Sequence, residues 1–100
     1  MQVIVELEQG GSIEGTIDDD IGDPVAGALI EVRSLSGTVL GEARSDARGR
    51  WRIDGVPEGD VRVVAEPPAA LSALLAPIEE RSDVLRGEVT TEVRLRFERR

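Results

Sequence analysis

GEARSDARGRWRIDGVPEGDVRVVAE, residues 41–66, contains two strand-like alternations separated by short turns. Trp51 and Ile53 alternate with charged residues, and the same two-residue period returns in VRVVA after a Val-Pro-Glu-Gly turn. Successive side chains of a β-strand point to opposite faces, so this pattern predicts strands with one buried and one solvated face. The stretch therefore predicts an antiparallel all-β domain with tight turns at Gly49 and Gly59.

The composition sets the size of the domain and narrows its chemistry. One hundred residues, of which 40% are hydrophobic, suffice for one domain with one core. The chain contains no histidine, cysteine or lysine, so it lacks the usual bases for a serine nucleophile, a Schiff-base amine and the nitrogen and sulfur ligands of zinc. We therefore expect a protein that is not an enzyme.

The charge of the chain argues against two classes of partner. Its formal net charge of −8 would repel the phosphates of nucleic acids and of anionic membrane surfaces. No apolar run approaches the roughly 20 residues needed to cross a bilayer. The Met1 start has neither the basic region nor the apolar region of a signal peptide. We expect a protein partner, no nucleic acid and no membrane insertion.

Alternation continues along most of the chain. We predict strands at 12–17, 25–33, 38–43, 50–54, 61–65 and 89–97, and a further short strand within 78–87. In the last long strand, positions 89, 91, 93, 95 and 97 are predicted to share the inward face. Strands at this spacing, without crossover helices, predict an antiparallel sandwich of seven to eight strands.

One apolar segment does not alternate. Residues 69–76 place Leu71, Leu74 and Leu75 at helical spacing between two prolines, which predicts a short helical turn. This segment is interpreted as a lid over one open end of the sandwich, and an exposed patch for a partner is the alternative.

The N-terminal residues form a separate unit in this interpretation. Val3, Val5 and Leu7 alternate with other residues, and a Gly-Gly pair follows them. We predict that residues 1–9 form an extra strand and that 10–100 form the sandwich. The extra strand would pair as an edge strand of its own sandwich or add to a sheet of a neighbouring copy.

Four pieces of the sequence resemble the carboxypeptidase regulatory-like domain, which is related to the B-type repeats of bacterial surface adhesins. They are SIEGTI (12–17), DPVAGA (23–28), SDARGRWRI (45–53) and VPEG (56–59). The resemblance implies a prealbumin-like, Greek-key sandwich and an extracellular or cell-envelope location. It also implies a structural or interaction module within a larger exported protein. The isopeptide bond found in adhesin repeats requires lysine, which this chain lacks.

Two features of the sequence, an acidic loop and a tryptophan, could bind small ligands. Asp18, Asp20 and Asp23 lie in a dense acidic loop and could bind calcium, which prefers carboxylate oxygens, although a solvated turn is the simpler interpretation. Trp51 could stack on a carbohydrate, but its place in a strand alternation favours the core. The leading hypothesis is therefore a non-catalytic structural or protein-interaction module without a cofactor, and a calcium-binding or carbohydrate-binding module is the alternative.

Overall fold

The computed structural model describes residues 10–85 and 87–100, with the backbone alone at Glu92. Its strands, in chain order, are β1 (Gly11–Asp18), β2 (Leu29–Ser34), β3 (Val39–Arg44), β4 (Arg50–Val56), β5 (Gly59–Glu66), β6 (Leu75–Ala76), β7 (Ile78–Val84), β8 (Val89–Arg96) and β9 (Glu98–Arg99). The strand predicted in residues 1–9 lies outside the described residues, as do Val3, Val5 and Leu7.

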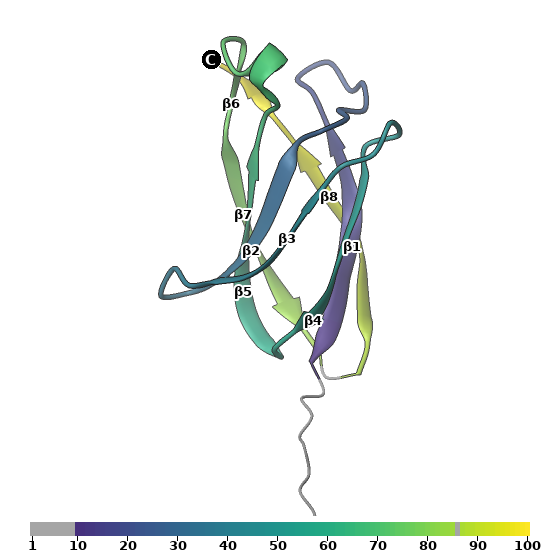
Figure 1. Ribbon diagram of the computed structural model, residues 1–100, viewed down its shortest axis with the longest axis vertical. Helices are drawn as coiled ribbons and strands as arrows, with labels where there is room; N and C mark the ends of the chain where they lie inside the picture. Colours follow the sequence, from purple (N-terminus) through teal and green to yellow (C-terminus); the bar gives the residue numbers. More distant parts are fainter. Residues whose placement is uncertain (1–9, 86) are drawn as a thin grey trace, which may run out of the picture.

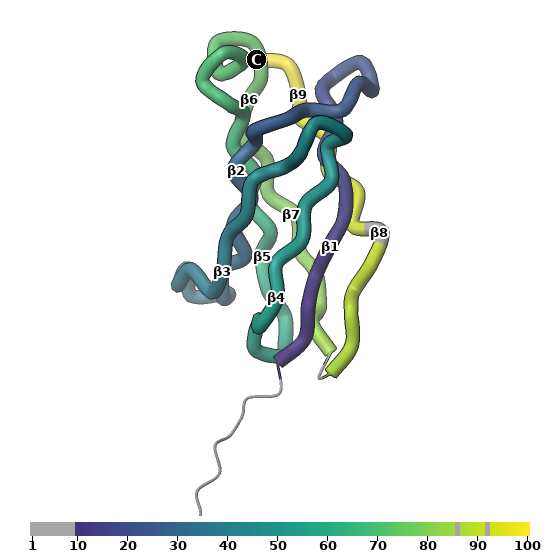
Figure 2. The backbone as a smooth tube through the Cα atoms, turned by 45° about the vertical axis from the view of Figure 1, so that its right-hand side comes forward, coloured from purple at the N-terminus to yellow at the C-terminus, as the bar shows by residue number. Residues whose placement is uncertain are grey.

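The seven long strands form two sheets that pack face to face (Figure 1, Figure 2). The three-stranded sheet has the order β4-β1-β8, and the four-stranded sheet has the order β3-β2-β5-β7. The short strands β6 and β9 pair separately. The predicted all-β sandwich is thus confirmed. Within the described residues, no helix is long and apolar enough to span a membrane.

The antiparallel prediction needs one correction. Adjacent long strands run antiparallel except β1 and β8, which pair in parallel. A short hairpin turn forces its two strands to run antiparallel. Most of the chain separates β1 from β8, however, so tertiary packing alone sets their relative direction.

The core lies between the sheets and follows the predicted alternation. Trp51 and Ile53 are each 4% exposed, and the inward positions 61, 63 and 65 of β5 are buried. The predicted inward face of 89–97 is buried only towards its end. Leu95 and Phe97 are in the core, whereas Val89 is 43% exposed. An apolar side chain is buried only where another layer covers it, and alternation alone does not show how far that layer extends.

The turns and the apolar segment were predicted with different success. Gly49 has φ 75° and Gly59 has φ 126°, so both occupy the left-handed region that favours glycine, as predicted. Within 69–76, only η1 (Ala69–Leu71) is helical, and it is a 3₁₀ helix. No side chain caps its N-terminus. Leu75 belongs to β6, where it pairs with Arg99 of β9, so the helix stops well short of the predicted end.

Candidate functional site

The acidic loop between β1 and β2 is organised by Asp19. One carboxylate oxygen of Asp19 accepts the backbone N–H groups of Ile21 at 3.0 Å and Asp23 at 2.9 Å. These bonds, led by the one from Asp23, hold the pKa of Asp19 below its ordinary value. The loop is therefore a self-bonded turn of the kind that aspartate favours.

An arginine of β8 binds the backbone of this loop. Arg96 donates from Nε to the carbonyl oxygen of Asp19 at 3.2 Å and from Nη2 to that of Asp20 at 2.8 Å. The guanidinium of Arg99 lies 3.9 Å from the Asp20 carboxylate. The loop thus already has cationic partners, and the sequence did not indicate them because Arg96 is 76 residues from Asp20.

The predicted calcium ligands are Asp18, Asp20 and Asp23. Asp18 ends β1 and forms an isolated bridge to Pro24, while Asp20 faces Arg99. In the part of the chain that the structure describes, no group of three or more acidic side chains could hold a metal ion. Calcium binding stays a prediction, and the described geometry provides no set of donors for it.

Trp51 lies in the core, as its alternation predicts. Its side chain is almost completely buried, and so is that of Phe97, the other aromatic residue of the chain. Neither ring is available for stacking on a carbohydrate. The indole Nε1 of Trp51 has no hydrogen-bond partner among the described residues. A buried N–H without a partner lowers stability, so Trp51 contributes through packing rather than hydrogen bonding.

The apolar segment 69–76 fits the lid interpretation in part, because two of its residues pack on the core while most of the others are exposed. Leu75 is buried in the core, and Leu71 packs against it. Leu74, however, is 52% exposed, and Ile21 of the acidic loop is 73% exposed. Both residues line a shallow groove of about 210 Å³. This end of the molecule therefore combines a lid with a small exposed apolar surface.

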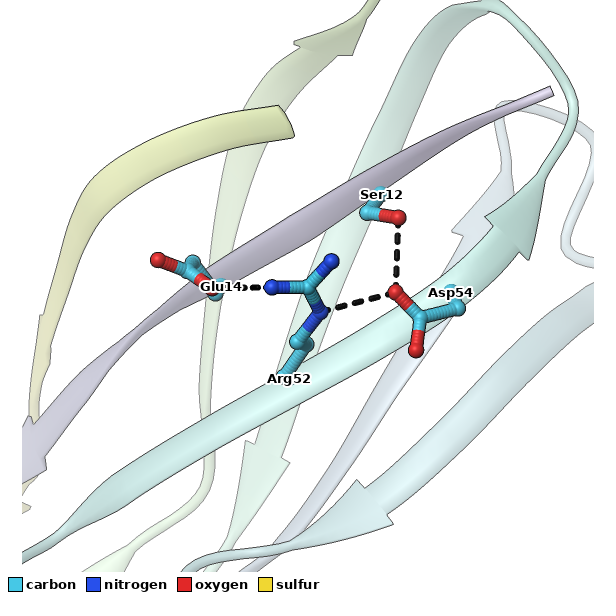
Figure 3. A network of polar contacts seen from close by, with 4 residues as sticks. All are labelled: Ser12, Glu14, Arg52 and Asp54. Carbon is cyan, nitrogen blue, oxygen red and sulfur yellow. Dashed lines mark hydrogen bonds and ion pairs between the residues drawn. The ribbon is translucent and has the colours of Figure 1, made fainter. Parts of the chain in front are cut away.

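A polar network lies on the outer face of the three-stranded sheet (Figure 3). Arg52 of β4 donates from Nη1 to Glu14 of β1 at 3.0 Å and from Nε to Asp54 at 2.8 Å. Ser12 donates to the same oxygen of Asp54 at 2.7 Å. The hydroxyl of Ser12, followed by Arg52, lowers the pKa of Asp54, and Asp54 raises the pKa of Arg52. The network thus pairs one guanidinium with two carboxylates.

A wide groove of about 810 Å³ begins beside this network. Its lining comes mainly from the three-stranded sheet, with further residues from the end of β3 and from the connection between β3 and β4. The charged lining residues are the four arginines Arg44, Arg50, Arg52 and Arg94 and the two acids Glu14 and Asp46. The groove therefore has an excess of positive charge in a protein whose net charge is −8. The sequence alone does not indicate this surface, because its residues come from four separate segments.

The sheet edges are the other surfaces available for contact. β4 and β8 are the outer strands of one sheet, and β3 and β7 are the outer strands of the other. β7 contains the charged sequence IEERSD. Charged side chains on an edge strand hinder uncontrolled strand addition. The β7 edge is thus poorly suited to uncontrolled pairing with another chain.

Comparison with known proteins identifies a family and a fold. The family model of the carboxypeptidase regulatory-like domain matches residues 12–83, which is more than half of the chain. No curated protein matches the chain significantly. Several solved structures have a similar fold.

Three of these structures are bacterial. The TIE protein of Bacillus anthracis aligns over 92% of this chain and 17% of its own, with a TM-score of 0.69 and 19% identity. The minor pilin GBS52 of Streptococcus agalactiae aligns over 92% and 45%, with a TM-score of 0.68 and 19% identity. The major pilin subunit BcpA of Bacillus cereus aligns over 92% and 31%, with a TM-score of 0.70 and 16% identity. The chain spans less than half the length of each, and the likeness concerns the fold.

Proposed function

The chain belongs to the carboxypeptidase regulatory-like domain family, and from this premise we propose that it is a non-catalytic structural module of a larger exported or cell-surface protein. The module would be connected in series with other domains and would contact proteins through its sheet edges and outer faces. Similar folds in a minor pilin and in a major pilin subunit support this proposal.

The pairing of β1 with β8 is the observation that carries the proposal. These are the first and last long strands of the described chain, and they lie side by side in parallel over most of their length. The chain enters β1 at one end of the sandwich, and its C-terminus lies at the opposite end (Figure 1). Pulling the two ends apart would slide β1 along β8, so their hydrogen bonds would resist the force together. Such an arrangement suits a module that transmits tension.

Single-molecule stretching tests this proposal directly. The chain has no cysteine, so introduced cysteines would be unique attachment points. Handles at the two chain ends would load the β1–β8 pair in shear. Handles at Ser12→Cys and Glu88→Cys would instead pull apart two neighbouring residues at the beginning of both strands and would open the pair one bond at a time.

We expect a clearly higher unfolding force with the handles at the chain ends than with the handles at positions 12 and 88. Equal forces in the two geometries would contradict a tension-bearing role. Light scattering of the 100-residue chain and of a chain that begins at Gly11 would show whether copies also assemble. Oligomers that disappear without residues 1–10 would support self-assembly through the predicted N-terminal strand. Monomers in both cases would favour a module that is linked only covalently, in series with other domains of the same chain.

A further inference from the structure

Two arginines face each other across the three-stranded sheet. Thr16 of β1 is the register partner of Arg50 in β4 on one side and of Arg94 in β8 on the other. Residues directly opposite in neighbouring strands share a face, and neighbouring strands lie about 4.8 Å apart. The Cα atoms of Arg50 and Arg94 are therefore separated by about 10 Å. All three residues line the groove of about 810 Å³.

The arginines of the neighbouring rows have hydrogen-bond partners, whereas those of this row have none among the described residues. One row along β1, Glu14 is paired with Arg52. In the other direction, Arg96 is bonded to the carbonyl groups of the acidic loop. In the described part of the chain, the side chains of Arg50 and Arg94 have no hydrogen bond or ion pair. Two unpaired like charges on one row repel each other, so an anion placed between them would be favourable.

The nearest carboxylate in the groove, that of Asp46, does not lie between Arg50 and Arg94. Asp46 lies in the connection before β4, and one of its oxygens accepts the backbone N–H groups of Arg48 and Arg50, both at 2.9 Å. These bonds, led by that from Arg50, lower the pKa of Asp46 and fix its carboxylate in its own hairpin. Asp46 therefore attracts Arg50 but does not lie between Arg50 and Arg94. The position above Thr16, between the two arginines, can accept another anion.

The composition of the surface narrows the class of anion. A net charge of −8 opposes every polyanion, and it opposes long ones such as nucleic acids more than a short segment with few charges. Both aromatic residues are buried, so no aromatic ring offers a stacking surface for a sugar. Carboxylates, by contrast, accept two parallel hydrogen bonds from a guanidinium, and the Thr16 hydroxyl can donate a further one.

We propose that Arg50, Thr16 and Arg94 bind the carboxylates of an extended acidic segment of a partner polypeptide. This deepens the proposed function, because it states the chemistry of the protein that such a module would contact. The segment would lie in the groove across β4, β1 and β8, with its acidic side chains directed towards the two guanidinium groups. Its affinity would be modest and would decrease with added salt, since the arginines are exposed.

The test uses a rhodamine-labelled peptide of eight alternating glutamate and serine residues, with fluorescence anisotropy at low salt. We expect the double variant R50A/R94A to weaken binding about tenfold or more, since each arginine contributes a charge-assisted bond. The double variant R50K/R94K retains the charge without the bidentate geometry and should give an intermediate affinity. Circular dichroism would confirm that each variant is folded.

The control removes a matched pair of arginines from the other sheet. Arg62 and Arg81 are cross-strand partners in β5 and β7, and R62A/R81A changes the net charge by the same amount as R50A/R94A. We expect less than a twofold effect on peptide binding from this control. An equal loss in both double variants would show that only net charge matters and would overturn the proposal.

Two further outcomes would overturn the proposal. One is the absence of peptide binding at low salt. The other is tighter, R50A/R94A-sensitive binding of a sulfated oligosaccharide with the same number of charges, which would assign the row to a sulfated glycan. The stretching experiment does not depend on either arginine. A negative result in the peptide-binding experiment would therefore leave the proposed structural role intact. A negative result in the stretching experiment would leave the proposed binding site for an acidic segment intact.

Discussion

The outer faces of the two sheets both contain a row of arginines, but in only one row do arginines form ion pairs with carboxylates of the described residues. On the four-stranded sheet, the row consists of Arg33, Arg62 and Arg81 from β2, β5 and β7. The next row contains Glu31 and Glu79, which form ion pairs with Arg33 and Arg62. Carboxylates two residues away along the sheet thus satisfy most of this row.

On the three-stranded sheet, the corresponding row is Arg50, Thr16 and Arg94. Its neighbouring carboxylate, Glu14, is already bound to Arg52. The two faces therefore have similar residue types but differ in whether their arginines have carboxylate partners. On the four-stranded face, the arginines of β2 and β5 have carboxylate partners. On the three-stranded face, the guanidinium groups of Arg50 and Arg94 have no such partner among the described residues. This difference in ion pairing depends on the strand register and on the residues in the adjacent row, and it does not depend on the number of arginines.

A substitution that disturbs the register of β1 and β8 should have the largest effect on the three-stranded face. A β-carbon at Gly15 would overlap the backbone carbonyl oxygen of Val93, which cannot move without shifting β8. We expect Gly15→Ala to reduce the free energy of unfolding by more than about 3 kcal/mol, up to complete unfolding. Urea denaturation followed by Trp51 fluorescence would measure the loss.

Gly41→Ala on β3 provides the matched control. There the added β-carbon would lie 2.7 Å from Cγ2 of Ile53, and a side-chain methyl group can shift more easily than a backbone carbonyl. We expect a loss of about 1–2 kcal/mol from Gly41→Ala. A larger loss from Gly41→Ala than from Gly15→Ala would contradict the close β1–β8 pairing on which the Arg50–Thr16–Arg94 row depends.

Ser45 tests the connection between the two faces, since it lies where the chain passes from β3 to β4. Its buried hydroxyl donates to the carbonyl oxygen of Val25 at 2.6 Å and accepts from the N–H of Ala28 at 2.9 Å. Ser45→Ala leaves two buried backbone groups without this partner and should cost about 1–3 kcal/mol in thermal or urea unfolding. The exposed variant Ser36→Ala should cost less than about 0.5 kcal/mol. Similar losses from the two variants would show that the buried hydroxyl is not required.

Arg94 and Arg96 lie in the same strand and should contribute differently to stability. Arg96 holds the acidic loop through two hydrogen bonds, whereas Arg94 has no bonded partner among the described residues. We expect Arg96→Ala to reduce the free energy of unfolding by about 1 kcal/mol and Arg94→Ala to change it by less than about 0.5 kcal/mol. Parallel urea titrations would measure both. A larger effect from Arg94→Ala would mean that this guanidinium is already bound within the fold.

The smallest expected effect concerns the pH dependence of the Ser12–Asp54 contact. The pKa of Asp54 is lowered in the folded protein, so its contacts contribute stability above the ordinary aspartate pKa of about 3.9. This contribution should decrease as the pH falls below about 4 and through the lower folded pKa. Asp54→Asn should therefore destabilise the protein slightly at pH 7 and less at pH 3. Melting curves that differ equally at both pH values would contradict this prediction.

Much of the fold could be predicted from local sequence. The alternation around Trp51 and Ile53, together with the turns at Gly49 and Gly59, correctly gave strands, turns and inward faces, because these features depend on neighbouring residues. The apolar segment 69–76 was harder. Its leucine spacing suits a helix, but the chain end pairs with Leu75 and Ala76 as β9 and converts them to strand. A partner more than 20 residues away was decisive there.

The candidate site could be predicted less well, for the same physical reason. The sequence alone determined an all-β sandwich, its buried alternating positions and the absence of common catalytic side chains, since composition and two-residue periodicity are local properties. Only the tertiary structure decided that β1 and β8 are parallel and that Arg50 and Arg94 flank Thr16. It also decided that Arg96 binds the acidic loop in which calcium was predicted. Register between distant strands depends on the packing of the whole core, and a single strand does not specify it.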